Sequence, residues 1–140
     1  MHMIKLCVGV STLEELESYR EERAHWWGAD YGENVHVHRT RTRPVRAEVI
    51  EASGSIYWVI AGVVRARQKV LRLAEATDSE GKACCDIIMA PQLIRVVPRP
   101  KRPFQGWRYL KPEEAPSDLR EGMGEGSAEL ADELARLGLI

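Results

Sequence analysis

The chain has 140 residues, of which 44% are hydrophobic and 29% are charged, and its formal net charge is −1. This length is typical of one domain that buries its core without help from disulfides or metals. No apolar run approaches the roughly 18 residues that span a bilayer, and the N-terminus is too short in apolar length for an export signal, so we expect a cytoplasmic protein without a membrane contact.

The first third of the chain predicts a strand, a helix and a second strand. Residues 4–10 are apolar enough for a buried strand. The sequence Ser11-Thr12-Leu13-Glu14 offers an N-cap hydroxyl and a glutamate three residues later, which predicts a helix as far as Trp26. Residues 28–34 break that helix. Residues 35–43 alternate with period two, so we expect a strand with its valines towards the core and its histidines outward or towards a cleft.

The middle of the chain predicts most of a sheet. Residues 46–52 form a short helical turn, and residues 55–60, rich in β-branched and aromatic side chains, predict a central strand. Residues 63–76 fit both periods, and we interpret them as a strand. The Asp78-Ser79-Glu80-Gly81 cluster predicts a hairpin turn into a strand over residues 84–89, and residues 94–97 predict another strand.

The last third predicts surface segments. Three prolines within residues 98–103 remove amide donors, so we expect this stretch to run extended outside the interior of the sheet. Residues 122–127 predict a flexible linker, and residues 128–137 predict an acidic helix with one leucine stripe. The expected organisation is an α+β domain over residues 1–119, followed by a linker and an acidic helix over residues 120–140.

The charges are segregated along the chain. Residues 36–111 carry 15 basic and 6 acidic side chains, whereas residues 1–35 carry 3 and 7, and residues 112–140 carry 2 and 8. A basic middle section is typical of a polyanion-binding surface, because guanidinium groups donate charge-assisted hydrogen bonds to phosphates. The alternative is that these cations pair with the acidic ends of the same chain.

Two segments of this middle section carry the predicted contacts. One holds the arginines of residues 39–46 and 65–72, and the other, residues 99–111, interleaves aromatic rings with cations. Rings could stack on bases while the cations neutralise the phosphates. The alternative for Phe104 and Trp107 is to plug the end of a barrel. The predicted nucleic-acid-binding residues are Arg41, Arg43, Arg46, Tyr57, Trp58, Arg65, Arg67, Arg102, Trp107, Arg108 and Tyr109.

Signatures of catalysis and metal binding are weak. The cysteines, Cys7, Cys84 and Cys85, are expected to be reduced. His36 and His38 point the same way on a strand, but two ligands do not form a metal site. The sequence has no phosphate-binding glycine loop and no nucleophile elbow. We therefore predict neither a metal nor another cofactor, and leave open whether the chain is an enzyme.

Three blocks of sequence resemble a bacterial family known as domain of unknown function 1489. They are residues 4–9 (IKLCVG), residues 54–60 (GSIYWVI) with residues 65–68 (RARQ), and residues 102–110 (RPFQGWRYL). The resemblance covers nearly the whole chain and implies no activity, because none is established for the family.

The order of the predicted elements is also similar, more remotely, to the PUA and ASCH group of small β-barrels, many of which bind RNA or modified bases. This resemblance implies a PUA-like barrel of five to six mostly antiparallel strands, with a helix after the first strand, a short helix before the central strand and a C-terminal helix. It places a cleft near Arg41, Arg43, Arg46, Tyr57 and Trp58. ASCH hydrolases use a lysine, a threonine and a glutamate; Thr40 or Thr42 and Glu48 lie in the corresponding region, but arginines replace the lysine, which argues against amidohydrolase chemistry.

The leading hypothesis is a module that binds RNA or a nucleotide in a basic cleft with aromatic stacking. One alternative is a hydrolase acting on a nucleoside-like small molecule in the same cleft. Another is a protein-interaction module whose acidic C-terminal helix docks on a partner or on the basic face of its own chain.

Overall fold

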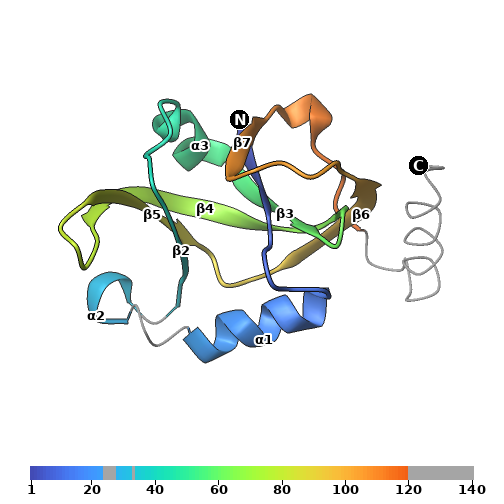
Figure 1. Ribbon diagram of the computed structural model, residues 1–140. Helices are drawn as coiled ribbons and strands as arrows, with labels where there is room; N and C mark the ends of the chain where they lie inside the picture. The colour runs from blue at the N-terminus through green and yellow to red at the C-terminus, as the bar shows by residue number, and fades with distance from the viewer. Residues whose placement is uncertain (24–27, 33, 120–140) are drawn as a thin grey trace.

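The computed structural model describes residues 1–23, 28–32 and 34–119 and is built around a seven-stranded sheet (Figure 1). The strands are β1 (His2–Leu6), β2 (His36–Thr40), β3 (Ser55–Ile60), β4 (Val63–Thr77), β5 (Ala83–Met89), β6 (Ile94–Pro100) and β7 (Trp107–Leu110). The helices are α1 (Leu13–Arg23), α2 (Gly28–Tyr31) and α3 (Ala47–Ser53), and a 3-10 turn covers Pro112–Glu114. The predicted α+β class is confirmed.

The sheet is organised along β4, which is fifteen residues long. The strand order is β2-β5-β4-β3-β1-β7, and β6 pairs with β4 beside this path. The pairs are antiparallel except for β1 and β3, which run parallel. Among the described strands β2 and β7 remain as the two ends, so the sheet is not closed into the barrel that the remote resemblance implied.

Helix α1 starts one residue later than the capping sequence suggested. The amide of Glu15 donates to Thr12 Oγ1 (3.1 Å), and the Glu15 carboxylate accepts from the amide of Ser11 (3.0 Å). Thr12 is therefore the capping hydroxyl and Glu15, not Glu14, is its reciprocal partner. The helix lays Leu13 and Leu16 on the core.

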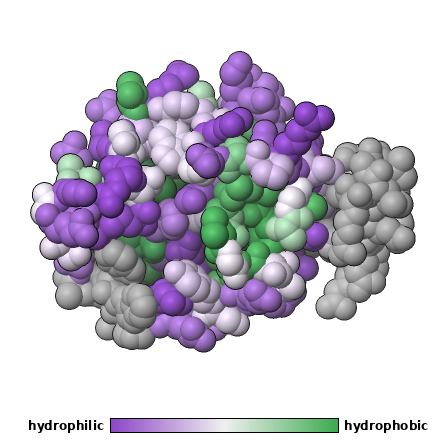
Figure 2. All heavy atoms as spheres, viewed as in Figure 1, coloured by the Kyte–Doolittle hydropathy of each residue, from purple (hydrophilic) through white to green (hydrophobic). Residues whose placement is uncertain are grey.

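The sheet is covered on both faces around β3, which explains why every residue of this strand is buried. Alternate residues point to opposite faces of a strand. Trp58 thus lies in the larger core cluster with residues of α1 and α3, while Tyr57 lies in a second cluster with Phe104 and Leu110. Figure 2 shows an apolar area, bordered by hydrophilic side chains, above α1 in this view.

Two predictions near the chain's end have different outcomes, and one strand there was not predicted. Strand β6 continues through Pro98 and Pro100, where we expected a segment outside the sheet; Val63 and Val64 of β4 pair with Pro100 and Arg99. Proline is tolerated there because this strand does not lie in the sheet interior. Strand β7 was not predicted. The predicted linker and acidic helix lie outside the described residues. Within the described ranges, no helix is long and apolar enough to cross a membrane.

Candidate nucleic-acid interface

Most arginines of the first predicted segment are held by carboxylates of this chain. Of the four paired arginines, three pair with an acid 37 or more residues away, so most of the neutralisation could not be read from local charge. The pairs are Arg39 with Asp86 (2.6 Å), Arg41 with Asp78 (2.9 Å), Arg43 with Glu51 (3.3 Å) and Arg67 with Asp118 (2.8 Å). The side chain of Arg65 is partly buried. An external phosphate would have to compete with these carboxylates.

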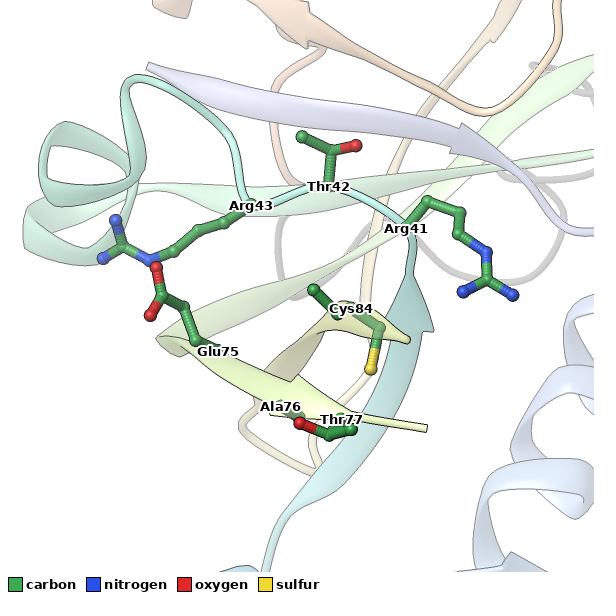
Figure 3. A pocket seen from close by; sticks show the side chains of 8 residues that line it. Arg41, Thr42, Arg43, Glu75, Ala76, Thr77 and Cys84 are labelled. Carbon is green, nitrogen blue, oxygen red and sulfur yellow. The ribbon is translucent and has the colours of Figure 1, made fainter. Parts of the chain in front are cut away.

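A hollow of about 730 Å³ lies beside Arg41 and Arg43, and Thr42 and Cys84 also line it. Figure 3 shows that the two guanidinium groups point in opposite directions. Arg41 reaches Asp78, whereas Arg43 donates to the carbonyl of Leu73 (3.0 Å) and to Glu51. The two arginines therefore do not converge on one anion. Glu48 is not among the residues that line the hollow, so Thr42 and Glu48 do not meet there.

Two of the predicted nucleic-acid-binding residues belong to the core. Trp58 and Tyr57 are both buried, and Trp58 Nε1 donates to Gln68 Oε1 (3.0 Å). Tyr57 packs edge-on against His2, with ring centroids 5.1 Å apart. A base cannot stack on either ring in this conformation.

The cations of the second segment have a different environment. We call Arg99, Lys101, Arg102, Arg108 and Lys111 the cationic strip. Lys101 and Arg108 lie over the ring of Phe104, at 5.9 and 5.0 Å from its centroid, and Arg99 donates to the carbonyl of Glu114 (2.9 Å). Within the described part of the chain, none of the five forms an ion pair with a carboxylate. Their charges remain available to an external anion.

Aromatic side chains line the other face of β7. Trp107 and Tyr109 pack edge-to-face, with centroids 5.0 Å apart; Trp107 is partly buried against the core, and Tyr109 is 38% exposed. The Tyr109 hydroxyl accepts a hydrogen bond from the amide of Arg46 (3.1 Å), whose own side chain is exposed. Because residues alternate along a strand, Arg108 and Tyr109 face opposite sides of β7. A ligand reaching both must cross this end strand of the sheet.

The histidines of β2 face the core beneath α1, not the solvent as one of our expectations had it. His36 is buried and its Nδ1 lies 3.0 Å from Gln68 Nε2, while His38 packs edge-on against Trp58, with centroids 5.7 Å apart. Burial, together with the charges of Arg20 and Lys5, lowers the pKa of His38 to about 3. Both histidines are therefore neutral at physiological pH.

Lowering the pH should decrease the free energy of unfolding, because folded His38 does not take up the proton that unfolded His38 binds. An unfolded histidine has a pKa near 6.5, so between pH 6.5 and pH 3 the unfolded state binds a proton that folded His38 does not. The free energy of unfolding should therefore fall with decreasing pH, by about 1.4 kcal/mol per unit for this one proton. Urea unfolding at pH 7, 6 and 5 measures the slope. The His38→Asn variant should show a slope smaller by about one proton, and equal slopes would contradict this role.

The cysteines are poorly suited to nucleophilic chemistry. Cys84 and Cys85 are buried free thiols, and Cys7 is partly buried. Burial raises the pKa of the Cys85 thiol to about 11 and also raises the pKa of Cys7. Since the thiolate is the nucleophile, neither is activated at neutral pH.

Sequence reasoning assigned no role to two further basic residues, Arg20 and Lys5. Arg20 lies on α1 and is buried among core residues, and Lys5 lies on β1. The available signal was the position of Arg20 on the apolar stripe of the helix, four residues after Leu16.

Comparisons with known proteins identify relatives without an activity. The model of a family described as "Protein of unknown function (DUF1489)" matches residues 3–140. No curated protein and no solved structure matches the sequence.

Proposed function

The chain belongs to the DUF1489 family, and because this membership assigns no activity, we propose from its geometry that it binds single-stranded RNA, or a nucleotide within it, along the cationic strip. The observation that carries the proposal is the contrast between two groups of cations. Four of the seven arginines of the first segment are paired with carboxylates, whereas the strip has no ion pair within the described residues.

The shape of the strip favours a single strand over a folded small ligand. Its cations lie on β6, in the loop between β6 and β7, on β7 and directly after β7. Two of them, Arg99 and Lys101, line a hollow of about 280 Å³, and the other three are not among its lining residues. Tyr109 supplies an exposed ring at one end, beside Arg46. Backbone neutralisation with one or two stacked bases is the mode by which single-stranded nucleic acids are bound without a deep pocket. The remote PUA-like relationship, which rests on the order of the elements, is part of this proposal.

Removing cations from the strip should weaken RNA binding and its salt dependence together. Binding of a fluorescently labelled short RNA can be measured by anisotropy over a series of salt concentrations. Each phosphate contact contributes roughly −0.7 to the slope of log K against log salt on single strands. The triple variant Lys101→Ala/Arg102→Ala/Arg108→Ala should therefore have a slope smaller by about 2. Tyr109→Ala should weaken binding by roughly 1–3 kcal/mol and leave the slope unchanged.

The matched control removes the same charge elsewhere. Lys69, Arg72 and Lys82 have exposed side chains on or beside β4 and β5, outside the strip. The triple variant Lys69→Ala/Arg72→Ala/Lys82→Ala should keep most of the slope. Equal losses in the two triple variants would mean that only net charge matters, and absence of binding by the unmodified chain at low salt would refute the proposal.

A further inference from the structure

Arg20 is a buried cation whose hydrogen bonding is incomplete. It is only 5% exposed, and its Nη1 donates to the carbonyl of Val37 (2.9 Å). The guanidinium carbon lies 5.0 Å from the centroid of the Trp58 ring. Its Nε is buried without a hydrogen-bond partner. A buried charge is costly unless an opposite charge compensates it, and within the described residues Arg20 has no carboxylate partner.

A cavity of about 120 Å³ opens beside this guanidinium, between the end of β1 and α1. Its polar lining comes from Lys5, Cys7, Tyr19, Arg20 and His38, and Trp58 forms part of the apolar wall. No aspartate or glutamate lines the cavity within the described part of the chain. Two cations thus border one small space without a compensating anion.

The Lys5 ammonium has little to hold it. Within the described residues its one hydrogen bond is a long one, 3.5 Å to the carbonyl of the neighbouring Leu6. Burial lowers the pKa of Lys5 and of Arg20, which means that the charged form of each side chain is destabilised by its loss of solvent. An anion bound beside both side chains would stabilise their charged forms and offset this destabilisation. His38, neutral beside them, keeps one ring N–H that can donate to the same anion.

We propose that this cavity binds a phosphoryl group carried by a small molecule or by the end of a nucleic acid. Two cations match a group that carries about −1.5 to −2 charges at neutral pH, where a carboxylate carries one. Guanidinium and ammonium groups together are also common phosphate ligands. The volume is below the roughly 300 Å³ at which ordinary ligand pockets begin, so the remainder of the ligand lies outside the cavity.

The opposing account is that Arg20 is only structural, held by Val37 and Trp58. The unmodified chain separates the two accounts, by thermal unfolding with inorganic phosphate, or with acetate or chloride at equal ionic strength. A phosphoryl site predicts a saturable rise in Tm with phosphate that acetate and chloride do not reproduce. No rise with phosphate, or the same rise with acetate, would overturn the proposal.

Amino-acid substitutions test whether phosphate binds in this cavity. Arg20→Met keeps the length of the side chain without its charge and should weaken phosphate binding roughly tenfold or more, because a charge-assisted hydrogen bond is lost. Arg72→Met removes one exposed charge of β4 outside the cavity and should bind phosphate as the unmodified chain does. If Arg20→Met does not fold, Lys5→Met replaces it with the same expectation. Unchanged phosphate binding in the folded cavity variant would exclude this location.

The source of the phosphoryl group is tested with one short RNA in two forms. If a nucleic acid end is the natural ligand, a 5′-phosphorylated trinucleotide should compete with phosphate for the cavity better than its 5′-hydroxyl form. Equal competition by both forms, together with phosphate binding, assigns the cavity to a small phosphorylated molecule. The proposal does not rest on the cationic strip, so either site can fail while the other stands.

Discussion

Replacing Gln68 with methionine should lower the free energy of unfolding by roughly 3 kcal/mol, although the change preserves volume and adds an apolar group to the core. Gln68 is fully buried in β4. Its Oε1 accepts from Trp58 Nε1 (3.0 Å), and its Nε2 donates to the carbonyl of Ala90 (2.9 Å) and lies 3.0 Å from His36 Nδ1. The substitution leaves a donor and two acceptors unsatisfied, and each unsatisfied buried group costs about 1–3 kcal/mol.

The donor and acceptor roles in this network are determined by chemistry. Indole Nε1 can only donate, so the Gln68 atom facing Trp58 must be the oxygen. The Gln68 nitrogen can then only donate to His36, which requires an unprotonated Nδ1 and places the imidazole proton on Nε2. Burial also lowers the pKa of His36, in agreement with a neutral ring. One amide thus positions the indole, the imidazole and the loop after β5.

Chemical denaturation monitored by tryptophan fluorescence measures the Gln68 effect. Gln105 provides the control, because it is exposed and makes no described hydrogen bond, so Gln105→Met should change the free energy of unfolding by less than about 0.5 kcal/mol. A Gln68→Met variant as stable as the unmodified chain would show that the three groups find other partners, and the network would then not be a determinant of stability.

Replacing Asp86 with alanine should lower the free energy of unfolding by roughly 1–3 kcal/mol, because charge-assisted hydrogen bonds to a buried carboxylate are lost. Asp86 is 1% exposed and accepts from Tyr31 Oη (2.7 Å), Arg39 Nε (2.6 Å) and Arg39 Nη2 (3.0 Å). Burial opposes ionisation of this carboxyl, but the bonds from Arg39 and Tyr31 still hold its pKa below the usual range. Its removal leaves the guanidinium and the hydroxyl without their acceptor.

The chain contains a matched pair for this experiment. Arg67 and Asp118 form the same two-pronged contact, with both distances 2.8 Å, but the Asp118 side chain is 45% exposed. Asp118→Ala should therefore cost less than about 1 kcal/mol, because the carboxylate that is removed is largely hydrated and Arg67 keeps its hydrogen bond to Ser55 Oγ. Equal effects of the two substitutions would mean that burial does not set the strength of these pairs.

A spectroscopic measurement complements the stability data. Burial, with the hydrogen bond to Asp86, raises the pKa of Tyr31 to about 12. The Asp86→Ala variant should therefore ionise this phenol at a lower pH in an absorbance titration, whereas Asp118→Ala should not.

The strands that could be predicted are those whose pattern is local. Residues 55–60 are β-branched and aromatic throughout, and the turn at residues 78–81 brings β5 back along β4. Strand β7 could not be predicted, because its four residues form a strand only by pairing with β1 from the other end of the chain. The strand predicted over residues 94–97 is the first part of β6, but its continuation through Pro98 and Pro100 was not predicted, because only its place beside one segment of β4 permits those prolines.

The sequence predicted which basic and aromatic residues the candidate site contains, but not which of their side chains are free to contact a ligand. The sequence shows that residues 36–111 are basic, yet Arg67 finds its carboxylate 51 residues away and Arg39 finds its own 47 residues away. Trp58 was predicted to lie near a binding cleft because of the remote resemblance to PUA-like barrels, whereas cover on both faces of β3 buries it. Conversely, Arg20 is visible in the sequence as one charge on a helix, and only the packing shows that no carboxylate of the described residues pairs with it.

The length of β4 also bears on how the molecule loses its structure. Its first part pairs with β3 and β6, and its later part pairs with β5, so one continuous strand belongs to both ends of the sheet. The strands at either end can separate from the domain only by breaking their hydrogen bonds to β4, which also pairs with the strands of the other end. The described residues thus form a single cooperative unit, in which damage at either end is distributed over the whole domain and not confined to one hairpin.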